Sequence, residues 1–407
     1  MEWKEVEIEQ TSIEIIDGDR GKNYPKNNEL TSSGYCLFLS AANVTKSGLQ
    51  FINNSFITKE KDALLRKGKL FLNDIVLTTR GTVGNVGLYS DDVPYKNMRI
   101  NSGMVIIRPG KDFDTMFLYQ YLRSCYFRAQ ITQYQSGSAQ PQLPISTLQK
   151  MKVIKPNIAA QRRIASVLSS LDRKIDLNNK INADLEEMAQ AIFKNWFVDF
   201  EPFKDGKFVD SELGMIPEGW KVGTLGDITK NKSAKVKERN DVKVLSPVTN
   251  GELVLSEEYF TKQVFSSSIA KYKIVNKGDF AYNPARVNIG SLGRNEFDFD
   301  GCVSPVYVVF SVLDGYENYF DLFRKTDFFK DSVASLAIGG VRQSLSYDDL
   351  SLIETIIPSE NIVEKFNNLY NQMKKTIKAN KLESSRLSTL RDTLLPRLMS
   401  GELEVPE

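Results

Sequence analysis

The 407-residue chain contains no histidine. This absence excludes Ser-His-Asp and Cys-His triads and HExxH zinc motifs, and it removes the commonest general base near neutral pH. Aspartate and glutamate, acting with a metal or as an acid–base pair, remain open as catalytic groups.

Cysteine is scarce, and long apolar runs are missing. Cys36, Cys125 and Cys302 lie far apart without CxxC spacing, so we predict three packing cysteines and neither a disulfide framework nor a thiolate metal site. No apolar run approaches the roughly 18 residues of a membrane helix, and the first residues lack the order of a signal peptide. We therefore expect a cytoplasmic protein that makes no membrane contact.

Charge of one sign is also missing, because 53 lysines and arginines nearly balance 51 aspartates and glutamates. The formal net charge of +2 excludes a protein that binds nucleic acid by diffuse positive charge alone. Any DNA contact must come from local clusters or be shared with a partner. The length and the 41% of hydrophobic residues predict two modest cores with connectors.

The strongest positive feature is an internal repeat. An offset of 202 residues carries Leu143 to Leu345, Leu148 to Leu350, Ile154 to Ile356, Pro156 to Pro358, Ile175 to Ile377 and Asn178 to Asn380. Further upstream, an RxxxGxxG spacing occurs twice, as Arg80-Gly84-Gly87 and as Arg286-Gly290-Gly293. A register kept over tens of residues predicts one fold written twice.

Each half begins with short β-prone runs separated by Gly, Asn and Asp turns. Examples are 75–79, 104–107 and 306–310, with a helix expected near 117–126. We predict two similar mixed α+β domains, at 1–156 and 202–358. Pro156 and Pro358 then stand just before helical stretches, predicted at 157–201 and 359–407, because proline is compatible with helix entry.

Each helical stretch carries an apolar stripe with alternating steps of four and three. The stripe residues include Ile164, Leu168, Leu171, Ile175 and Leu185 in the first helix and Phe366, Tyr370, Met373, Ile377 and Leu387 in the second. Such a stripe is typical of a coiled-coil seam, and Asn178 and Asn380 interrupt both seams with a polar residue that can fix register. We expect two helices of about 40 residues, each about 60 Å long, paired antiparallel with pseudo-twofold symmetry. The alternative is two unrelated amphipathic helices, each capping its own domain.

Several segments along the chain resemble one known family. The run from Gln161 to Leu168, the stretch from Trp196 to Pro202 and the sequence 216–220 followed by 225–227 are similar to the central helical region and second domain of type I restriction–modification specificity subunits. The resemblance covers essentially the whole chain. Departures are Ala160, where the family often has Glu, Glu364-Lys365 at the equivalent place in the second half, and Pro396, which predicts a bend or break in the last helical turns.

The resemblance implies two target-recognition domains separated by two long antiparallel helices. It also implies that each domain reads one half of a bipartite double-stranded DNA target. Two methyltransferase subunits would dock on the chain, and two motor-nuclease subunits would join for restriction. S-adenosylmethionine, ATP and magnesium would then belong to these partners, and this chain would hold no cofactor or metal.

The residues agree with a non-catalytic role. An adenine methyltransferase needs an Asn/Asp-Pro-Pro-Tyr type of segment, and the nearest match, Tyr282-Asn283-Pro284-Ala285, lacks the second proline and the following aromatic. No GxxxxGK[ST] phosphate loop occurs either, which argues against ATP use.

Features shared by the two halves predict scaffold or phosphate contacts, and features in which they differ predict base contacts. In the shared RxxxGxxG loop, the glycines are expected in turns with positive φ, and Arg80 and Arg286 are expected on phosphates. A plain hairpin with a solvated arginine is the alternative. The divergent polar segments supply the other candidates: Arg20, Lys22, Lys96, Asn97, Arg99, Ser138, Gln140 and Gln142 in the first half, and Lys232, Lys235, Asn283, Asn288, Arg294, Arg342 and Gln343 in the second.

Two other functions stay open from the residues alone. One is a stand-alone two-headed DNA-binding regulator, against which the near-neutral charge argues, because a lone binder usually has a clear basic face. The other is a carboxylate- or metal-dependent nuclease. Asp74 and Asp279 correspond in the two halves, but each stands alone before a strand, where a turn residue is expected.

Overall fold

The computed structural model describes residues 3–134, 141–260, 262, 264–336, 344–403 and 405. The chain divides into a first unit, Met1–Asn179 with Lys381–Glu407, and a second unit, Lys180–Asn380. Both divisions fall inside the two long helices, α5 (Ile158–Phe197) and α11 (Glu360–Met399), which have 40 residues each. Each unit therefore contains a mixed α/β region and one part of each long helix.

An antiparallel four-stranded sheet forms the centre of the first unit. Its order is β2 (Glu14–Asp17), β10 (Met104–Arg108), β7 (Ile75–Thr78) and β8 (Val86–Leu88). Alternate residues of β7 and β10 face opposite sides, as strand geometry requires. Ile75 and Ile107 enter one hydrophobic core, and Val76 and Ile106 enter another. Cores on both faces explain why these strands are continuously apolar.

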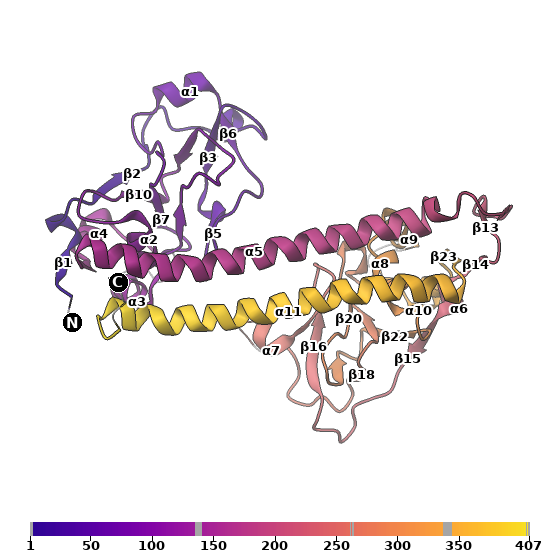
Figure 1. The fold of residues 1–407 in the computed structure, drawn as a ribbon. Helices are drawn as coiled ribbons and strands as arrows, with labels where there is room; N and C mark the ends of the chain where they lie inside the picture. Colours follow the sequence, from indigo (N-terminus) through magenta and orange to yellow (C-terminus); the bar gives the residue numbers. More distant parts are fainter. Residues whose placement is uncertain are drawn as a thin grey trace. The chain divides into compact units, whose positions relative to one another are not determined.

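Smaller elements complete the first unit. They are β1 (Glu5–Glu7) paired with β11 (Lys152–Ile154), a sheet of β6 (Phe56–Ile57), β3 (Cys36–Leu39) and β9 (Met98–Ile100), the hairpin of β4 (Val44–Thr45) and β5 (Gly48–Leu49), the helices α1 (Lys59–Leu64), α2 (Thr115–Arg123), α3 (Cys125–Tyr134) and α4 (Ile145–Lys150), and the 3-10 turns η1 (Ile8–Gln10), η2 (Asn27–Glu29) and η3 (Ala41–Asn43). Within this unit, α2 and α3 share the core with the start of α5, whereas α1 lies far from that helix (Figure 1).

The second unit repeats this chain path. Its four-stranded sheet has the order β15 (Thr229–Lys232), β22 (Val308–Val312), β19 (Phe280–Tyr282) and β20 (Leu292–Arg294). The other elements are β14 (Lys221–Thr224) paired with β23 (Glu354–Ile357), a sheet of β17 (Leu253–Leu255), β16 (Lys243–Pro247), β21 (Gly301–Val303) and β18 (Lys273–Val275), the pair β12 (Phe208–Val209) and β13 (Ile216–Pro217), helices α6 (Leu225–Ile228), α7 (Ser256–Tyr259), α8 (Glu317–Phe323), α9 (Asp327–Leu336) and α10 (Tyr347–Ser351), and turns η4 (Glu201–Phe203) and η5 (Val287–Ile289).

Strand pairing confirms the internal repeat at the level of topology. The sheet order β2-β10-β7-β8 has its counterpart in β15-β22-β19-β20, with every pair antiparallel. In the smaller sheets, β3 runs parallel to β9 just as β16 runs parallel to β21. The predicted mixed α/β class is therefore correct for both halves.

The two long helices begin two residues after Pro156 and Pro358, as predicted. In the first unit, Arg391 Nη1 of α11 donates to Asp172 Oδ1 of α5 at 2.7 Å, and Asn178 Nδ2 donates to Glu383 Oε2 at 2.8 Å. In the second unit, Asn380 Nδ2 donates to Asn182 Oδ1 at 2.9 Å. Residues with lower numbers in α5 contact residues with higher numbers in α11, so these contacts join antiparallel helices.

The ends of the long helices also belong to the domain cores. Of the predicted seam residues, Ile164, Leu168, Phe366, Tyr370 and Met373 are buried, whereas Leu171, Ile175, Leu185, Ile377 and Leu387 are half-buried. Ile164 and Leu168 share the first unit's core with Leu395 and Leu398, and Phe366 and Tyr370 enter the second unit's core. The long helices therefore contact each other by hydrogen bonds within each unit, and their ends also enter the hydrophobic cores.

The units cut across the ranges 157–201 and 359–407 predicted for the helices. The last turns of α11 pack in the first unit, where Trp3 Nε1 donates to the Leu398 carbonyl at 3.1 Å. The bend or break expected at Pro396 does not end the helix, which continues to Met399. Among the described helices, none combines the length and apolar character needed to cross a membrane.

Candidate nucleic-acid interface

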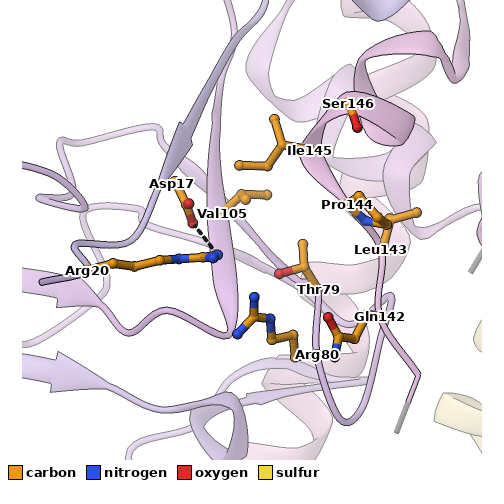
Figure 2. Close-up of a pocket in the computed structure, with 10 residues that line it drawn as sticks. All are labelled: Asp17, Arg20, Thr79, Arg80, Val105, Gln142, Leu143, Pro144, Ile145 and Ser146. Atoms are coloured by element: carbon orange, nitrogen blue, oxygen red, sulfur yellow. Dashed lines mark hydrogen bonds and ion pairs between the residues drawn. The ribbon is translucent and has the colours of Figure 1, made fainter. Parts of the chain in front are cut away.

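The first unit contains a hollow of about 350 Å³ where three predicted DNA-contacting residues meet (Figure 2). Arg20, Arg80 and Gln142 come from three separate segments of the chain and line it together. The remaining lining residues are Asp17, Thr79, Val105, Leu143, Pro144, Ile145 and Ser146. The fold thus gathers divergent polar segments that the sequence spreads over more than a hundred residues.

Backbone hydrogen bonds fix two of these segments to each other. Leu143 N donates to the Thr79 carbonyl at 2.9 Å, Gly81 N donates to the Pro141 carbonyl at 3.3 Å, and Arg80 forms an isolated bridge with Gln142. Arg80 N also donates to the Gly103 carbonyl at 3.2 Å, next to the start of β10. The side chains of Arg80 and Gln142 therefore project from a fixed piece of backbone.

The hollow carries positive charge that the described part of the chain does not neutralise. Arg20 pairs with Asp17 at 3.2 Å, but half of its side chain is exposed, and such surface pairs are weak. The Arg80 guanidinium is half-buried and forms no hydrogen bond or ion pair with another side chain of the described residues. Both guanidinium groups point into the hollow (Figure 2). This arrangement suits a phosphate or the acceptor edge of a base.

The shared RxxxGxxG spacing corresponds to the hairpin loops β7–β8 and β19–β20. Gly84 and Gly290 both have φ of +93°, as predicted for turn glycines. The prediction is wrong for Gly87 and Gly293, which lie inside β8 and β20 without positive φ. There, a Cβ would come within 2.6 Å of Leu49 or 2.5 Å of the Glu252 backbone, so close packing requires glycine.

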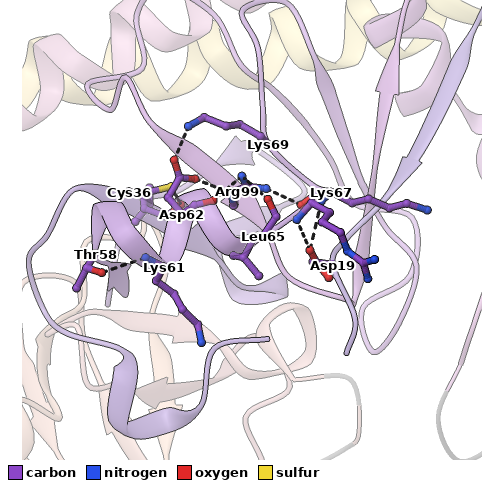
Figure 3. Close-up of polar contacts among 11 residues, drawn as sticks. Asp19, Cys36, Thr58, Lys61, Asp62, Leu65, Lys67, Lys69 and Arg99 are labelled. Carbon is purple, nitrogen blue, oxygen red and sulfur yellow. Dashed lines mark hydrogen bonds and ion pairs between the residues drawn. The ribbon is translucent and has the colours of Figure 1, made fainter. Parts of the chain in front are cut away.

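Arg99 has an internal role in place of the predicted DNA contact (Figure 3). It is 6% exposed, and its Nε donates to Asp62 Oδ1 at 2.5 Å. Its two Nη atoms donate to the carbonyls of Asp62, Leu65 and Lys67 at 2.7–3.0 Å. Because the Arg99 guanidinium is buried and hydrogen-bonded within the protein, we remove Arg99 from the candidate set.

The remaining candidates of the first half are spread over its surface. Lys22 and Lys96 are exposed and Asn97 is half-buried. The Tyr89 hydroxyl donates to the carbonyls of Tyr95 and Lys96, which fixes that loop but leaves the Lys96 side chain outside. Ser138 and Gln140, and also Arg342 and Gln343 of the second half, lie outside the described residues.

In the second unit, two candidates have partners inside the protein. Lys232 Nζ contacts both carboxylate oxygens of Asp279 at 2.8 and 3.0 Å. Burial raises the pKa of Asp279, and Lys232 opposes that effect. Arg294 donates to Asn318 Oδ1 at 2.9 Å and lies over the Phe280 ring at 5.8 Å. Both side chains remain partly exposed, but their charged ends are directed toward these partners.

The β19–β20 hairpin loop presents the other candidates of the second unit. Arg286 and Asn288 are exposed in this loop, and Lys235 is exposed in the loop after β15. Asn283 is half-buried, and its Oδ1 accepts a hydrogen bond from Ala285 N at 3.1 Å, which makes it a turn residue. Arg286 thus stands in the second unit where Arg80 stands in the first.

The groups that a nuclease or a thiol enzyme would need have other roles. Arg108 contacts both Asp74 oxygens at 2.8 and 2.9 Å, and Asp279 holds Lys232, so these corresponding carboxylates close turns and ion pairs. Burial raises the pKa of Cys36 to about 12 and that of Cys302 to about 11. Within the described ranges, no cluster of three or more acidic or thiol groups is placed to bind a metal.

Sequence reasoning missed Arg66 and Lys67. Both are exposed on the loop after α1, and their backbone amides donate to Asp19 Oδ2 at 2.5 and 3.3 Å. This contact places them beside the segment that carries Arg20 and Lys22. The available signal was the basic run Arg66-Lys67-Gly68-Lys69, in which Gly68 has φ of +80° and marks a turn.

Comparison with known proteins relates the chain to one family of DNA specificity domains. Residues 1–187 match the family described as type I restriction modification DNA specificity domain. Over these residues the chain is similar to this family. The MjaIX specificity subunit of Methanocaldococcus jannaschii, a type I restriction enzyme component, is 29% identical over 345 residues, which cover 82% of this chain and 78% of the relative. The HindI specificity subunit of Haemophilus influenzae is 22% identical, with 99% of this chain and all of that protein covered.

A solved structure has the same fold as this chain. The specificity subunit of a type I restriction–modification system from M. genitalium aligns with a TM-score of 0.57 at 16% identity, over 100% of this chain and 96% of the other. The matched family is described as a DNA specificity domain, and the listed relatives are specificity subunits of type I restriction enzymes. The family resemblance inferred from the sequence is therefore confirmed.

Proposed function

We propose that this chain reads a bipartite DNA target, with each unit reading one half. The observation that carries the proposal is the repeated topology with unlike polar loops. The central four-stranded sheets match strand for strand, while Arg20 and Gln142 in the first unit give way to different side chains in the second. A shared scaffold with divergent surface groups is what two different half-sites require.

Within each unit, we assign phosphate contact to the hairpin-loop arginine, Arg80 or Arg286. We assign base reading to divergent polar side chains, which are Arg20 and Gln142 beside Arg80 in the first unit and Lys235 and Asn288 on exposed loops of the second. Arginine and lysine suit guanine O6 and N7, and Gln or Asn suits adenine. The hollow supports this assignment, because an arginine fixed by its backbone lies next to a polar side chain from another segment.

We further propose that α5 and α11 form an antiparallel coiled coil that separates the two recognition domains and sets the unread spacer. Support comes from the interhelical contacts Arg391–Asp172, Asn178–Glu383 and Asn380–Asn182 within the units. Polar pairs in a seam fix register at some cost in stability. If both domains meet one side of the duplex, the half-site centres lie about 10 bp apart or a multiple of it.

The assembly that follows from this function contains two methyltransferase subunits docked on the chain, and two motor-nuclease subunits when it restricts DNA. S-adenosylmethionine, ATP and magnesium serve those partners in the cytoplasm. Nearly balanced charge supports a shared binding surface, because a lone DNA binder usually has a clear basic face. For the same reason, we favour this function over a stand-alone regulator.

The direct test is single-molecule mapping of methylated adenines in the source genome and in a strain that lacks this chain. We expect a two-part motif with an unread spacer that loses its methylation in the deletion strain. A continuous motif, or a motif that stays methylated without this chain, would contradict the proposal.

A binding experiment separates the subunit from the regulator. The purified chain should bind duplex DNA weakly and gain sequence-specific binding when its methyltransferase subunit is added. Tight, sequence-specific binding by the chain alone would favour the regulator.

A further inference from the structure

A second basic segment lies against the loop that carries Arg20 and Lys22. Asp19 fastens the two together, since its Oδ2 accepts from Arg66 N at 2.5 Å and from Lys67 N at 3.3 Å. On the same side, Asn23 Nδ2 donates to the Leu64 carbonyl at 3.3 Å. The loop after α1 is therefore joined to the 19–24 segment by side chains that reach its backbone.

Arg99 holds the other edge of this basic loop. Its Nη1 donates to the Lys67 carbonyl at 2.7 Å, and its Nη2 donates to the Leu65 carbonyl at 3.0 Å. Gly68 follows with φ of +80°, and a Cβ there would come within 3.2 Å of the Gly18 Cα. With amides and carbonyls both satisfied from within, the backbone of 65–68 has a fixed position and direction.

The side chains of Arg66 and Lys67 point outward from this fixed backbone. Both are exposed, and the Lys67 side chain extends away from the polar network (Figure 3). Burial raises the pKa of Asp19, but hydrogen bonds from backbone amides and the nearby Arg66 charge lower it, and the net shift of the pKa is downward. The hydrogen bonds to the Asp19 carboxylate come from backbone amides, and the exposed side chains of Arg66 and Lys67 remain accessible to an outside anion.

The second unit has basic loops at the corresponding place in its topology. There, the loop after β15 carries the exposed residues Lys235 and Lys237, and it runs beside the exposed Lys271. Backbone bonds join them, with Val236 N donating to the Tyr272 carbonyl and Lys237 N donating to the Ala270 carbonyl, both at 2.9 Å. Basic side chains occur at both places although the local sequences do not align.

We propose that Arg66 and Lys67 bind DNA phosphates beside the half-site of the first unit, and that Asp19 is the positioning residue for both. This inference rests on the proposed function and adds a contact that the hollow does not include. Two fixed cations next to Arg20 extend the positive surface from the hollow along the neighbouring loop. Phosphate contacts set the register of the protein on the duplex without reading bases.

The test uses the full chain assembled with its methyltransferase subunits and a duplex that carries the mapped motif. The variant is Arg66→Ala/Lys67→Ala, and the control is Lys111→Ala, an exposed lysine beyond the far end of β10 from Arg80. Losing two phosphate contacts should weaken binding roughly tenfold at moderate salt and reduce the slope of log K against log salt by about 1.8. The loss should be equal for specific and nonspecific duplexes, and the control should match the wild type.

Asp19 variants test the positioning role. Asp19→Ala should weaken binding severalfold in the wild-type chain and cause no further loss in the Arg66→Ala/Lys67→Ala background, because its effect passes through those two side chains. Asp19→Asn keeps an acceptor oxygen and should restore most of the affinity. A general folding defect would instead weaken binding in both backgrounds.

The outcomes distinguish a failure of the proposed function from a failure of the inference about Arg66 and Lys67. A wild-type assembly that does not bind the duplex specifically would refute the proposed function. Specific binding by the wild type, with a double variant that keeps the wild-type affinity and salt slope, would refute the inference about Arg66 and Lys67. An Asp19→Ala effect that adds fully to the double variant would refute its positioning role.

Discussion

The two units fasten corresponding loops by different chemistry. In the first unit, charged side chains do this work: Asp19 binds two backbone amides, and the buried pair Asp62–Arg99 binds three carbonyls. In the second unit, backbone groups join the corresponding pair of loops. The strand that corresponds to β9 is β21, which carries Cys302 and Val303, whereas β9 carries Arg99. The ion pair of the central sheet also differs, since Asp74 pairs with Arg108 of β10 but Asp279 pairs with Lys232 of β15.

This comparison teaches where a repeated fold is free to diverge. Strand order in the central sheet is the same in both units because the apolar alternation of its strands depends on it. Polar groups that hold loops can be exchanged as long as every buried donor and acceptor finds a partner. Each recognition surface can therefore change without disturbing the scaffold that it shares with the other.

The largest expected difference concerns the helix ends. The repeat places Phe366 where the first helix has Ile164, and they are 1% and 3% exposed. The Phe366 ring contacts the rings of Phe193, Trp196 and Phe197 in the core of the second unit. We expect Phe366→Ala to destabilise the second unit by about 3–5 kcal/mol and Ile164→Ala to destabilise the first by about 2–4 kcal/mol. Hydrogen exchange resolved by unit measures both, and equal losses in both units from one substitution would contradict the division.

Arg99→Met breaks the charged fastening of the first unit. Asp62 is then left buried with Lys69 as its remaining cation, so we expect a loss of about 3 kcal/mol. Chemical denaturation gives the value. Arg239→Met removes a partly exposed arginine paired with Asp241 and Asp300 in the second unit, and it serves as the control with little expected change. Similar losses of unfolding free energy for the two variants would contradict the claim that burial of the ion pair determines the size of the loss.

The turn glycines sharpen the comparison at one position. Gly84→Ala and Gly290→Ala both force a side chain into the left-handed region, which costs about 1–2 kcal/mol. At Gly290, a Cβ would also meet the Thr249 carbonyl oxygen at 2.5 Å, whereas at Gly84 it would meet the movable end of Ile131 at 3.2 Å. Denaturation midpoints should therefore fall further for Gly290→Ala, and the reverse order would contradict the packing argument.

The smallest expected effect is that of pH. The chain has no histidine, and burial raises the pKa of Cys36 to about 12 and that of Cys302 to about 11. A raised thiol pKa keeps the neutral form, so these groups reduce stability only at pH values above the usual thiol pKa. We expect the melting temperature of the isolated chain to be nearly constant between about pH 6 and pH 8. A clear slope in that window would indicate another titrating group.

The sequence predicted those features that depend on periodicity. Alternating steps of four and three predicted two helices of about 40 residues, and the offset of 202 residues predicted one topology twice. The sequence did not distinguish the internal Arg99 from the exposed Arg66. The ion-pair partner of Arg99 is Asp62, which lies 37 residues away in the chain. The meeting of Arg20, Arg80 and Gln142 likewise depends on strand pairing between distant segments. Tertiary contacts therefore decide which basic residues remain outside.

The most direct test of the account maps methylated adenines for two triple variants. One replaces Arg20, Arg80 and Gln142 of the first unit with alanine, and the other replaces Lys235, Arg286 and Asn288 of the second. We expect each variant to relax or lose one half of the methylated motif and to keep the other half and the spacer. A variant that changes both halves while its chain remains folded would contradict the claim that each unit reads its own half.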